Sequence, residues 1–145
     1  MEIREYVTLA EVKRICRELN IRDWTEMTAA KVSGDEAKII LHAVNVQGMN
    51  IPLEDFRQGL EVELEHGIRY DDANVTNNHP LLTGKIVLAH LKESMLYYKL
   101  LEVAEIEGDL IKAAAEGKAS KLEALYKKFV AARLILNQAE SKELA

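Results

Sequence analysis

Two pairs of glutamate and histidine stand three residues apart in the middle of the chain: Glu63 with His66, and His90 with Glu93. This spacing places both side chains of a pair on one face of a helix. Carboxylates and neutral imidazoles together form a ligand set that suits iron, manganese or zinc. Helical bundles that bind two metal ions project Glu-x-x-His pairs into their interior in this way. The four residues are therefore candidate ligands of a divalent metal.

Helical periodicity predicts that the second pair faces the core. On a helix that begins near residue 81, the side opposite His90 and Glu93 is marked by lysines that recur every seven residues: Lys85, Lys92 and Lys99. Glu63 projects beside Phe56 and Leu60 at the margin of the apolar stripe on its own helix. Two carboxylates removed from water would cost several kcal/mol without a cation or hydrogen-bond donors beside them. Tyr97, one turn beyond Glu93, is the candidate for a hydrogen bond to a liganding carboxylate. Lys85 is predicted as a further residue around the site, although it belongs to the row of lysines on the other side of the helix.

The same residues also admit an interpretation without metal or catalysis. His66 precedes Gly67, and a histidine at the end of a helix commonly compensates the helix dipole. His90, Glu93 and Tyr97 could satisfy one another as a buried hydrogen-bond network. In that case the protein is a structural or interaction module, and both interpretations stay open on the sequence alone.

The elements that position these residues are predicted to be helices throughout. The chain has only two prolines and seven glycines, and no segment alternates as a strand does. Capping boxes mark three helix starts, Thr8–Glu11, Ser33–Glu36 and Ser120–Glu123. Pro52 and Pro80 suit first turns, while Gly67 and Gly117 suit helix ends. The predicted helices are 8–19, 33–46, 53–66, 81–108 (or as far as 116) and a last helix from 120.

The predicted fold is all-α, an up-and-down-like bundle of four to five helices in a single domain over residues 1–145. Residues 1–50 supply N-terminal helices, 51–108 the central helix pair that carries the Glu and His motifs, and 109–145 a C-terminal helix. The polar segment 67–79 is expected to be an ordered surface connection, because it is rich in turn-forming Asp and Asn.

The amino-acid composition limits the classes of function that this chain can have. Nineteen Lys and Arg against 24 Asp and Glu give a net charge of −5, which argues against nucleic acid or an anionic membrane as partner. No signal peptide or membrane span is expected. The single cysteine, Cys16, cannot form an intramolecular disulfide, and we expect a reduced, cytoplasmic location.

Self-association is the partner that the sequence favours. The predicted long helix carries large apolar side chains on two flanks, more than one short bundle readily covers. They are Leu88, Leu91, Met95 and Ile106 on one flank, with Leu96 and Leu100 on another.

The central strings resemble a known family. They are FRQGLEVELEHG (56–67), NVTN (74–77), LTGKIVLAHLKE (82–93) and the paired Tyr97 and Tyr98. They resemble a family of bacterial, archaeal and phage proteins that is described only as a domain of unknown function, so the resemblance implies no activity. It does imply motif positions at Glu63, Glu65, His66, Asn74, Thr76, Lys85, His90 and Glu93. This chain departs from the family where Asn78 and His79 replace an acidic pair, and where Met95 and Leu96 replace Pro-Asp.

Overall fold

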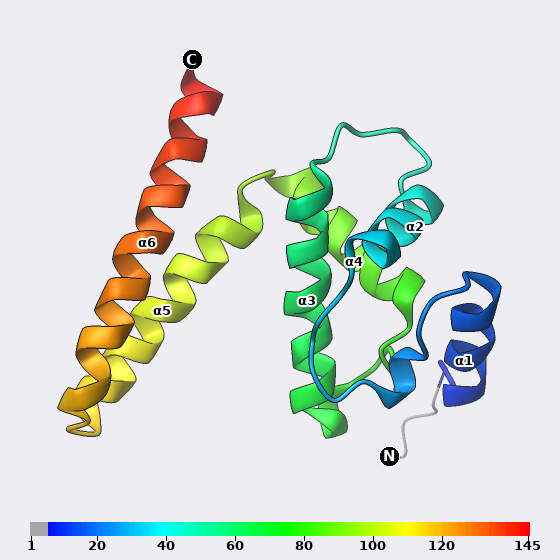
Figure 1. Cartoon of the computed structure of the whole chain (residues 1–145), viewed down its shortest axis with the longest axis horizontal. Helices are drawn as coiled ribbons and strands as arrows, with labels where there is room; N and C mark the ends of the chain where they lie inside the picture. The colour runs from blue at the N-terminus through cyan, green and yellow to red at the C-terminus, as the bar shows by residue number, and fades with distance from the viewer. Residues whose placement is uncertain (1–5) are drawn as a thin grey trace. The chain divides into compact units, whose positions relative to one another are not determined.

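The structure, a computed structural model, describes residues 6–145 and confirms the all-α prediction (Figure 1). No strand occurs in this part of the chain. Its elements are α1 (Leu9–Glu18), the 3₁₀ helix η1 (Trp24–Glu26), α2 (Gly34–Val44), α3 (Leu53–Arg69), the 3₁₀ helix η2 (Asp71–Ala73), α4 (Pro80–Glu93), α5 (Tyr97–Ala115) and α6 (Ala119–Leu144).

The helices form two compact units that meet in sequence at Glu93 and Ser94. This boundary falls inside the 51–108 segment that the sequence treats as one helix pair. The prediction of a single domain over 1–145 stays a prediction. Over the described range, every helix is too short or too polar to cross a bilayer.

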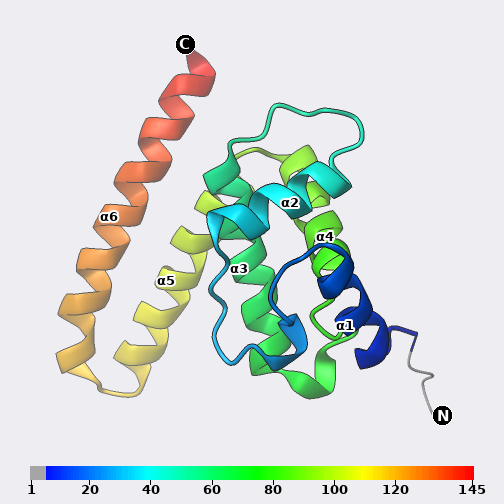
Figure 2. The same cartoon turned by 45° about the vertical axis from the view of Figure 1, so that its right-hand side comes forward.

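In the first unit, α2, α3 and α4 pack against one another, and α1 lies against α4 (Figure 2). The amphipathic faces of these helices supply a closed apolar core. Its largest fully buried side chains include Trp24, Ile40, Phe56, Leu60, Leu64 and Leu91. Gly84 lets α4 approach α2 closely, because a Cβ at this position would lie 2.6 Å from Cγ2 of Ile40.

Two of the three N-terminal caps predicted from sequence are confirmed. Thr8 accepts a hydrogen bond from the backbone of Glu11, and Ser33 forms a complete capping box with Glu36. Glu36 is buried, and its carboxylate also accepts two hydrogen bonds from the guanidinium of Arg22, at 2.9 and 2.6 Å. Burial alone would raise the pKa of Glu36, but the bonds from Arg22 and Ser33 outweigh it and lower the pKa to about 2.

The second unit is a hairpin of two helices. Gly117 adopts a left-handed backbone (φ 67°) that ends α5, as the sequence predicts, and α6 returns along α5 (Figure 1). The core between the two helices is small. Its buried members are Val103, Ala132 and Leu136, and the partly buried Leu96, Ile106 and Phe129 pack against them.

Three helix boundaries predicted from sequence are wrong. The long helix expected from residue 81 to 108 or 116 breaks at 94–96, where the Ser94 hydroxyl accepts the backbone N–H of Leu96 and competes with helical bonding. Gly67 does not end α3, which continues to Arg69. The Ser120–Glu123 box does not open α6, because that helix begins at Ala119 with no side-chain cap at its start.

The buried side of α4 also differs from the predicted one. In the first unit α4 packs on α2, α3 and α1, and it buries Thr83, Gly84, Val87, Leu88 and Leu91. Leu88 and Leu91, which the sequence offered as a surface for self-association, are thus already covered inside the first unit. Glu93 is exposed and does not face the core.

Candidate ligand-binding site

The structure brings one predicted pair of residues together across two helices. Oε1 of Glu63 on α3 lies 3.6 Å from Nε2 of His90 on α4. The Glu63 side chain is 18% exposed and that of His90 is 30% exposed, so both stand at the edge of the core. The sequence anticipated that Glu63 would need a partner, and the packing of α3 on α4 provides it.

The other predicted ligands do not join this pair. His66 is exposed near the end of α3, where its ring stacks on Tyr70 with 6.5 Å between ring centroids. Glu93 and Lys85 are exposed on α4. Tyr97 begins α5 in the second unit. Over residues 6–145, no group of three or more His, Cys, Asp or Glu side chains is arranged to hold a metal ion.

A pocket of about 250 Å³ with both polar and apolar walls opens beside Glu63, and we call it the α3–α4 pocket. It draws side chains from the last turns of α3, the segment 70–76 and the first turns of α4. Its lining residues are Glu63, His66, Gly67, Tyr70, Ala73, Asn74, Val75, Thr76, Thr83 and Ile86. Carboxylate, imidazole, phenol, amide and hydroxyl groups therefore converge on one small volume, with Tyr70, Val75 and Ile86 adding exposed apolar surface.

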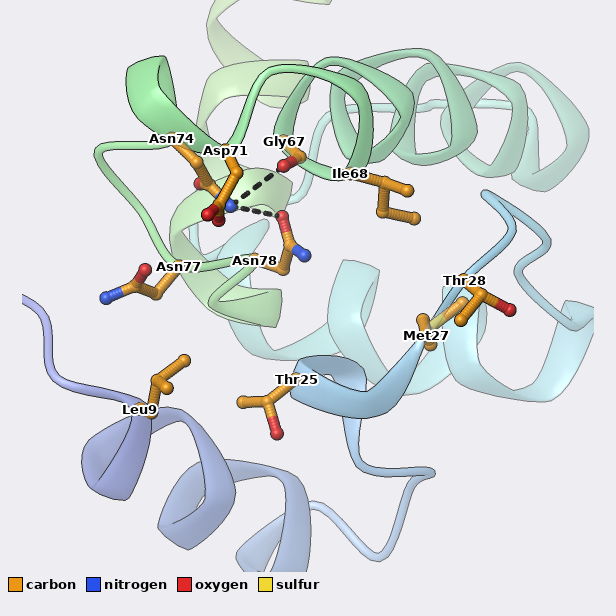
Figure 3. A pocket seen from close by; sticks show the side chains of 10 residues that line it. All are labelled: Leu9, Thr25, Met27, Thr28, Gly67, Ile68, Asp71, Asn74, Asn77 and Asn78. Atoms are coloured by element: carbon orange, nitrogen blue, oxygen red, sulfur yellow. Dashed lines mark hydrogen bonds between the residues drawn. The ribbon is translucent and has the colours of Figure 1, made fainter.

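Asn74 holds the wall of this pocket in place. Its amide Nδ2 donates to the carbonyl of Gly67 (3.1 Å) and to Oδ1 of Asn78 (3.0 Å), as Figure 3 shows. Its Oδ1 accepts from the hydroxyl of Thr76 at 3.3 Å. A Cβ at position 67 would lie 2.1 Å from Asn78 Oδ1, which explains why a glycine stands inside α3. Gly67 serves this close approach and not the termination of the helix.

A second pocket, of about 330 Å³, lies on the other side of Asn74 between the segment 71–78, η1 and α1 (Figure 3). Its lining residues are Leu9, Thr25, Met27, Thr28, Gly67, Ile68, Asp71, Asn74, Asn77 and Asn78. Asn77 and Asn78 adopt left-handed backbone conformations, which Asn tolerates better than most residues. The Asn77 amide donates to the carbonyl of Val7, so this side of the segment is occupied in attaching it to the N-terminal residues.

His79 ends the segment as a buried cap on α4. Its Nδ1 accepts the backbone N–H groups of Leu81 and Leu82 at 3.2 and 3.4 Å, a role that sequence reasoning missed because histidine is not a common N-cap residue. Burial lowers the pKa of His79, and Arg14 acts in the same direction, while nearby Glu11 opposes the shift.

Sequence reasoning also missed a set of hydrogen bonds on the opposite side of α3, where two side chains bind the backbone of Val32. Helical periodicity places Arg57 and Glu61 on a solvated face, yet Glu61 accepts the backbone N–H of Val32 at 3.0 Å. Arg57 bonds both Glu61 (2.6 Å) and the carbonyl of Val32 (3.3 Å). The spacing of four residues between them was the available signal, but it indicates only the ion pair and not the backbone it holds.

These features define a small all-α domain that carries a polar pocket between two of its helices. Residues 12–107 match the model of a family described as "Protein of unknown function (DUF5661)", so the chain belongs to that family. No curated protein and no solved structure matches the chain. Glu63, His66, Asn74 and Thr76, four of the positions that the sequence resemblance implies as motif positions, line the α3–α4 pocket.

Proposed function

We propose that the first unit binds a small polar molecule in the α3–α4 pocket. The observation that carries this proposal is that Glu63, His66, Asn74 and Thr76, which come from α3 and from the separate segment that follows it, line one cavity. A structural network would need no open volume between these groups. We also propose a cytoplasmic location for the protein. Cys16 is buried, and the sequence holds no second cysteine with which it could form a disulfide.

The size and chemistry of the pocket limit which ligands it could hold. A volume of about 250 Å³ equals roughly eight water molecules at about 30 Å³ each, which suits a metabolite fragment better than a nucleotide. Glu63 is the one acidic side chain in the lining and has a hydrogen-bonding amide and hydroxyls nearby. This arrangement favours a ligand that presents an amine or hydroxyl donor to the Glu63 carboxylate.

The test is a titration of the ¹⁵N-labelled full chain with ethanolamine, glycerol and acetate, followed by backbone chemical shifts. We expect ethanolamine to move the amides of Gly67, Asn74 and Thr76 more than acetate does. Glu63→Gln should remove this preference. Glu65→Gln makes the same chemical change on an exposed neighbour that does not line the pocket, and should retain it. If none of the three probes shifts these amides, or if both variants behave alike, the proposal is wrong.

A divalent metal such as iron, manganese or zinc is the second candidate, and the Glu63–His90 distance favours it. Two donors about 2.1 Å from a shared ion at a tetrahedral angle stand roughly 3.4 Å apart, close to the 3.6 Å between Oε1 and Nε2. The remaining coordination positions would belong to water or to a molecule in the adjacent pocket. Such an ion would act as a Lewis acid toward that molecule.

Titration calorimetry with Zn²⁺ and elemental analysis of the purified chain test the metal separately. His90→Ala should weaken Zn²⁺ binding at least tenfold, whereas His42→Ala removes an exposed histidine on α2 and should not. Equal affinities in the two variants would eliminate the metal and leave the proposal for the polar ligand intact.

A further inference from the structure

The N–H groups in the first turn of α4 all bond to one residue, His79. His79 is buried, and its Nδ1 accepts the backbone N–H groups of Leu81 and Leu82 at 3.2 and 3.4 Å. Its backbone carbonyl accepts the N–H of Thr83 at 2.9 Å, and Pro80 has no N–H to satisfy. The donors that the start of a helix leaves without helical partners therefore depend on this imidazole.

His79 is also bonded to the wall of the α3–α4 pocket. Its backbone N–H donates to the carbonyl of Thr76 at 3.0 Å, and both Thr76 and Thr83 line the pocket. The preceding residue, Asn78, accepts the side-chain amide of Asn74 through Oδ1 at 3.0 Å, as Figure 3 shows. Three residues that line the pocket thus bond either to His79 or to its neighbour in the chain.

The cap requires a neutral imidazole. An Nδ1 atom that accepts two N–H groups must hold a lone pair, so the proton of the neutral ring is on Nε2. Protonation would turn Nδ1 into a donor that faces two other donors. It would also place a positive charge at the N-terminus of α4, where the helix dipole disfavours cations. The protonated ring must therefore leave this position, and the cap is then lost.

Charged groups from α1 also act on this ring. In the described chain they are Glu11, which favours the protonated form, and Arg14, which disfavours it. Nε of Arg14 donates to Glu11 at 2.8 Å, so the two charges lie together and oppose each other. Burial is the largest influence, and it lowers the pKa of His79 below its ordinary value of 6.5. The ring is therefore neutral at pH 7 and becomes protonated on mild acidification.

We propose that His79 positions the wall of the α3–α4 pocket only while its ring is neutral, and that protonation frees the segment 74–78 from the start of α4. Asn77 and Asn78 hold left-handed backbone conformations, which cost free energy where the surroundings do not fix them. Loss of the cap therefore favours a rearrangement of these two residues. One consequence rests on the proposed function: a ligand in the pocket would bind more weakly as pH falls.

Titration of the ¹⁵N-labelled full chain from pH 7.5 to 5.0, without ligand, tests the positioning. The backbone amides of Leu81 and Leu82 should shift with the midpoint of the His79 ring. The side-chain amide of Asn74 should shift with the same midpoint, because Asn78 holds it. His79→Asn retains a cap acceptor that does not titrate and should remove all these shifts. His66→Asn removes the histidine that lines the pocket and should retain them.

A second variant separates the cap from its titration. His79→Ala lacks the cap at every pH, so at pH 7.5 it should already show the Asn74 side-chain shift that the wild type reaches at pH 5.0. Circular dichroism of His79→Asn should match that of the wild type, which keeps the comparison valid even if His79→Ala unfolds. An Asn74 shift that persists in His79→Asn would overturn the proposal. So would an Asn74 amide that stays fixed while the amide of Leu81 titrates.

Ethanolamine titrations at pH 7.5 and 5.5 test the consequence for binding. Over this range the wild type should lose about threefold more affinity than His79→Asn does. The comparison isolates His79, because His66 and His90 are present in both proteins. Equal losses would overturn the control of binding by His79. If ethanolamine binds at neither pH, the proposed function is wrong, and the ligand-free titration decides by itself whether His79 positions the wall.

Discussion

The two units of this chain solve the problem of burying apolar helix faces in different ways. In the first unit, three helices and the segments between them enclose Phe56, Leu60 and Trp24 completely. Hydrogen-bonded side chains then fix the connections, as Asn74 does for 70–78 and Glu61 for Val32. In the second unit, two helices share a small core and leave Ile111 and Tyr126 largely in water.

The difference places the features that could hold a small ligand in the first unit, around the α3–α4 pocket. A pocket whose walls are held by Asn74 needs a rigid surrounding, and the closed core of the first unit provides it. The family model extends from residue 12 to 107, over most of the first unit and the first half of α5.

Core truncation should separate the two units most strongly. Phe56→Ala removes a fully buried ring and should lower the free energy of unfolding of the first unit by about 3–5 kcal/mol, independently of protein concentration. Leu136→Ala removes a fully buried side chain from the hairpin and should cost about 2–3 kcal/mol, less than Phe56→Ala, because the smaller side chain leaves a smaller cavity. Urea denaturation of the two variants measures both losses. An equal or larger loss in Leu136→Ala would contradict the difference between the two cores.

The second-largest effect on stability is expected when the buried carboxylate of Glu36 is removed. Glu36→Ala removes the capping box of α2 and the partner of Arg22, and we expect a loss of about 2–3 kcal/mol. The folded pKa of about 2 lies below the ordinary value of 4.5, so this contribution is complete above pH 4.5 and declines as pH falls toward 2. Wild type and variant should therefore converge in stability at low pH. A constant difference from pH 7 to pH 2 would contradict the ion pair.

Two glycines inside helices give a matched comparison of the units. Gly67→Ala should destabilise the first unit by about 1–2 kcal/mol despite the better helix propensity of Ala, because the new Cβ would displace Asn78 from Asn74. Gly108→Ala in α5 meets no atom within 4 Å and should stabilise the hairpin by about 0.5–1 kcal/mol. Thermal unfolding of the two variants and of the wild type measures both changes in stability. A stabilised Gly67→Ala would show that the segment 70–78 is not packed on α3.

The smallest expected effect is a pH dependence confined to the first unit. His79 is buried with a lowered pKa, so its contribution to stability is present above the ordinary value of 6.5 and is lost as pH falls through the folded pKa. His79→Asn retains an N-cap acceptor without a titrating group and should flatten the stability profile just below pH 6.5. Urea midpoints between pH 7.5 and 5.5 measure this slope. An unchanged slope would assign the titration to another group.

Local sequence determined most of the secondary structure. Thr8 and Ser33 mark helix starts because a cap involves only residues within one turn of each other. Gly117 ends α5 because few other residues adopt a left-handed backbone easily. The sequence also identified Glu63 as a carboxylate beside a buried stripe that would require a partner, and His90 is within 3.6 Å.

Tertiary structure decided the features that depend on residues far apart in the chain. Gly67 reads as a helix end by itself, and only the approach of Asn78 shows that it is a contact position inside α3. Glu93 shares a spacing motif with His90, yet packing of α2 and α3 on α4 turns it to solvent. The convergence of Glu63, Asn74 and Thr76 on one pocket likewise follows from docking the segment 70–78, because hydrogen bonds between distant segments leave no periodic trace in the sequence.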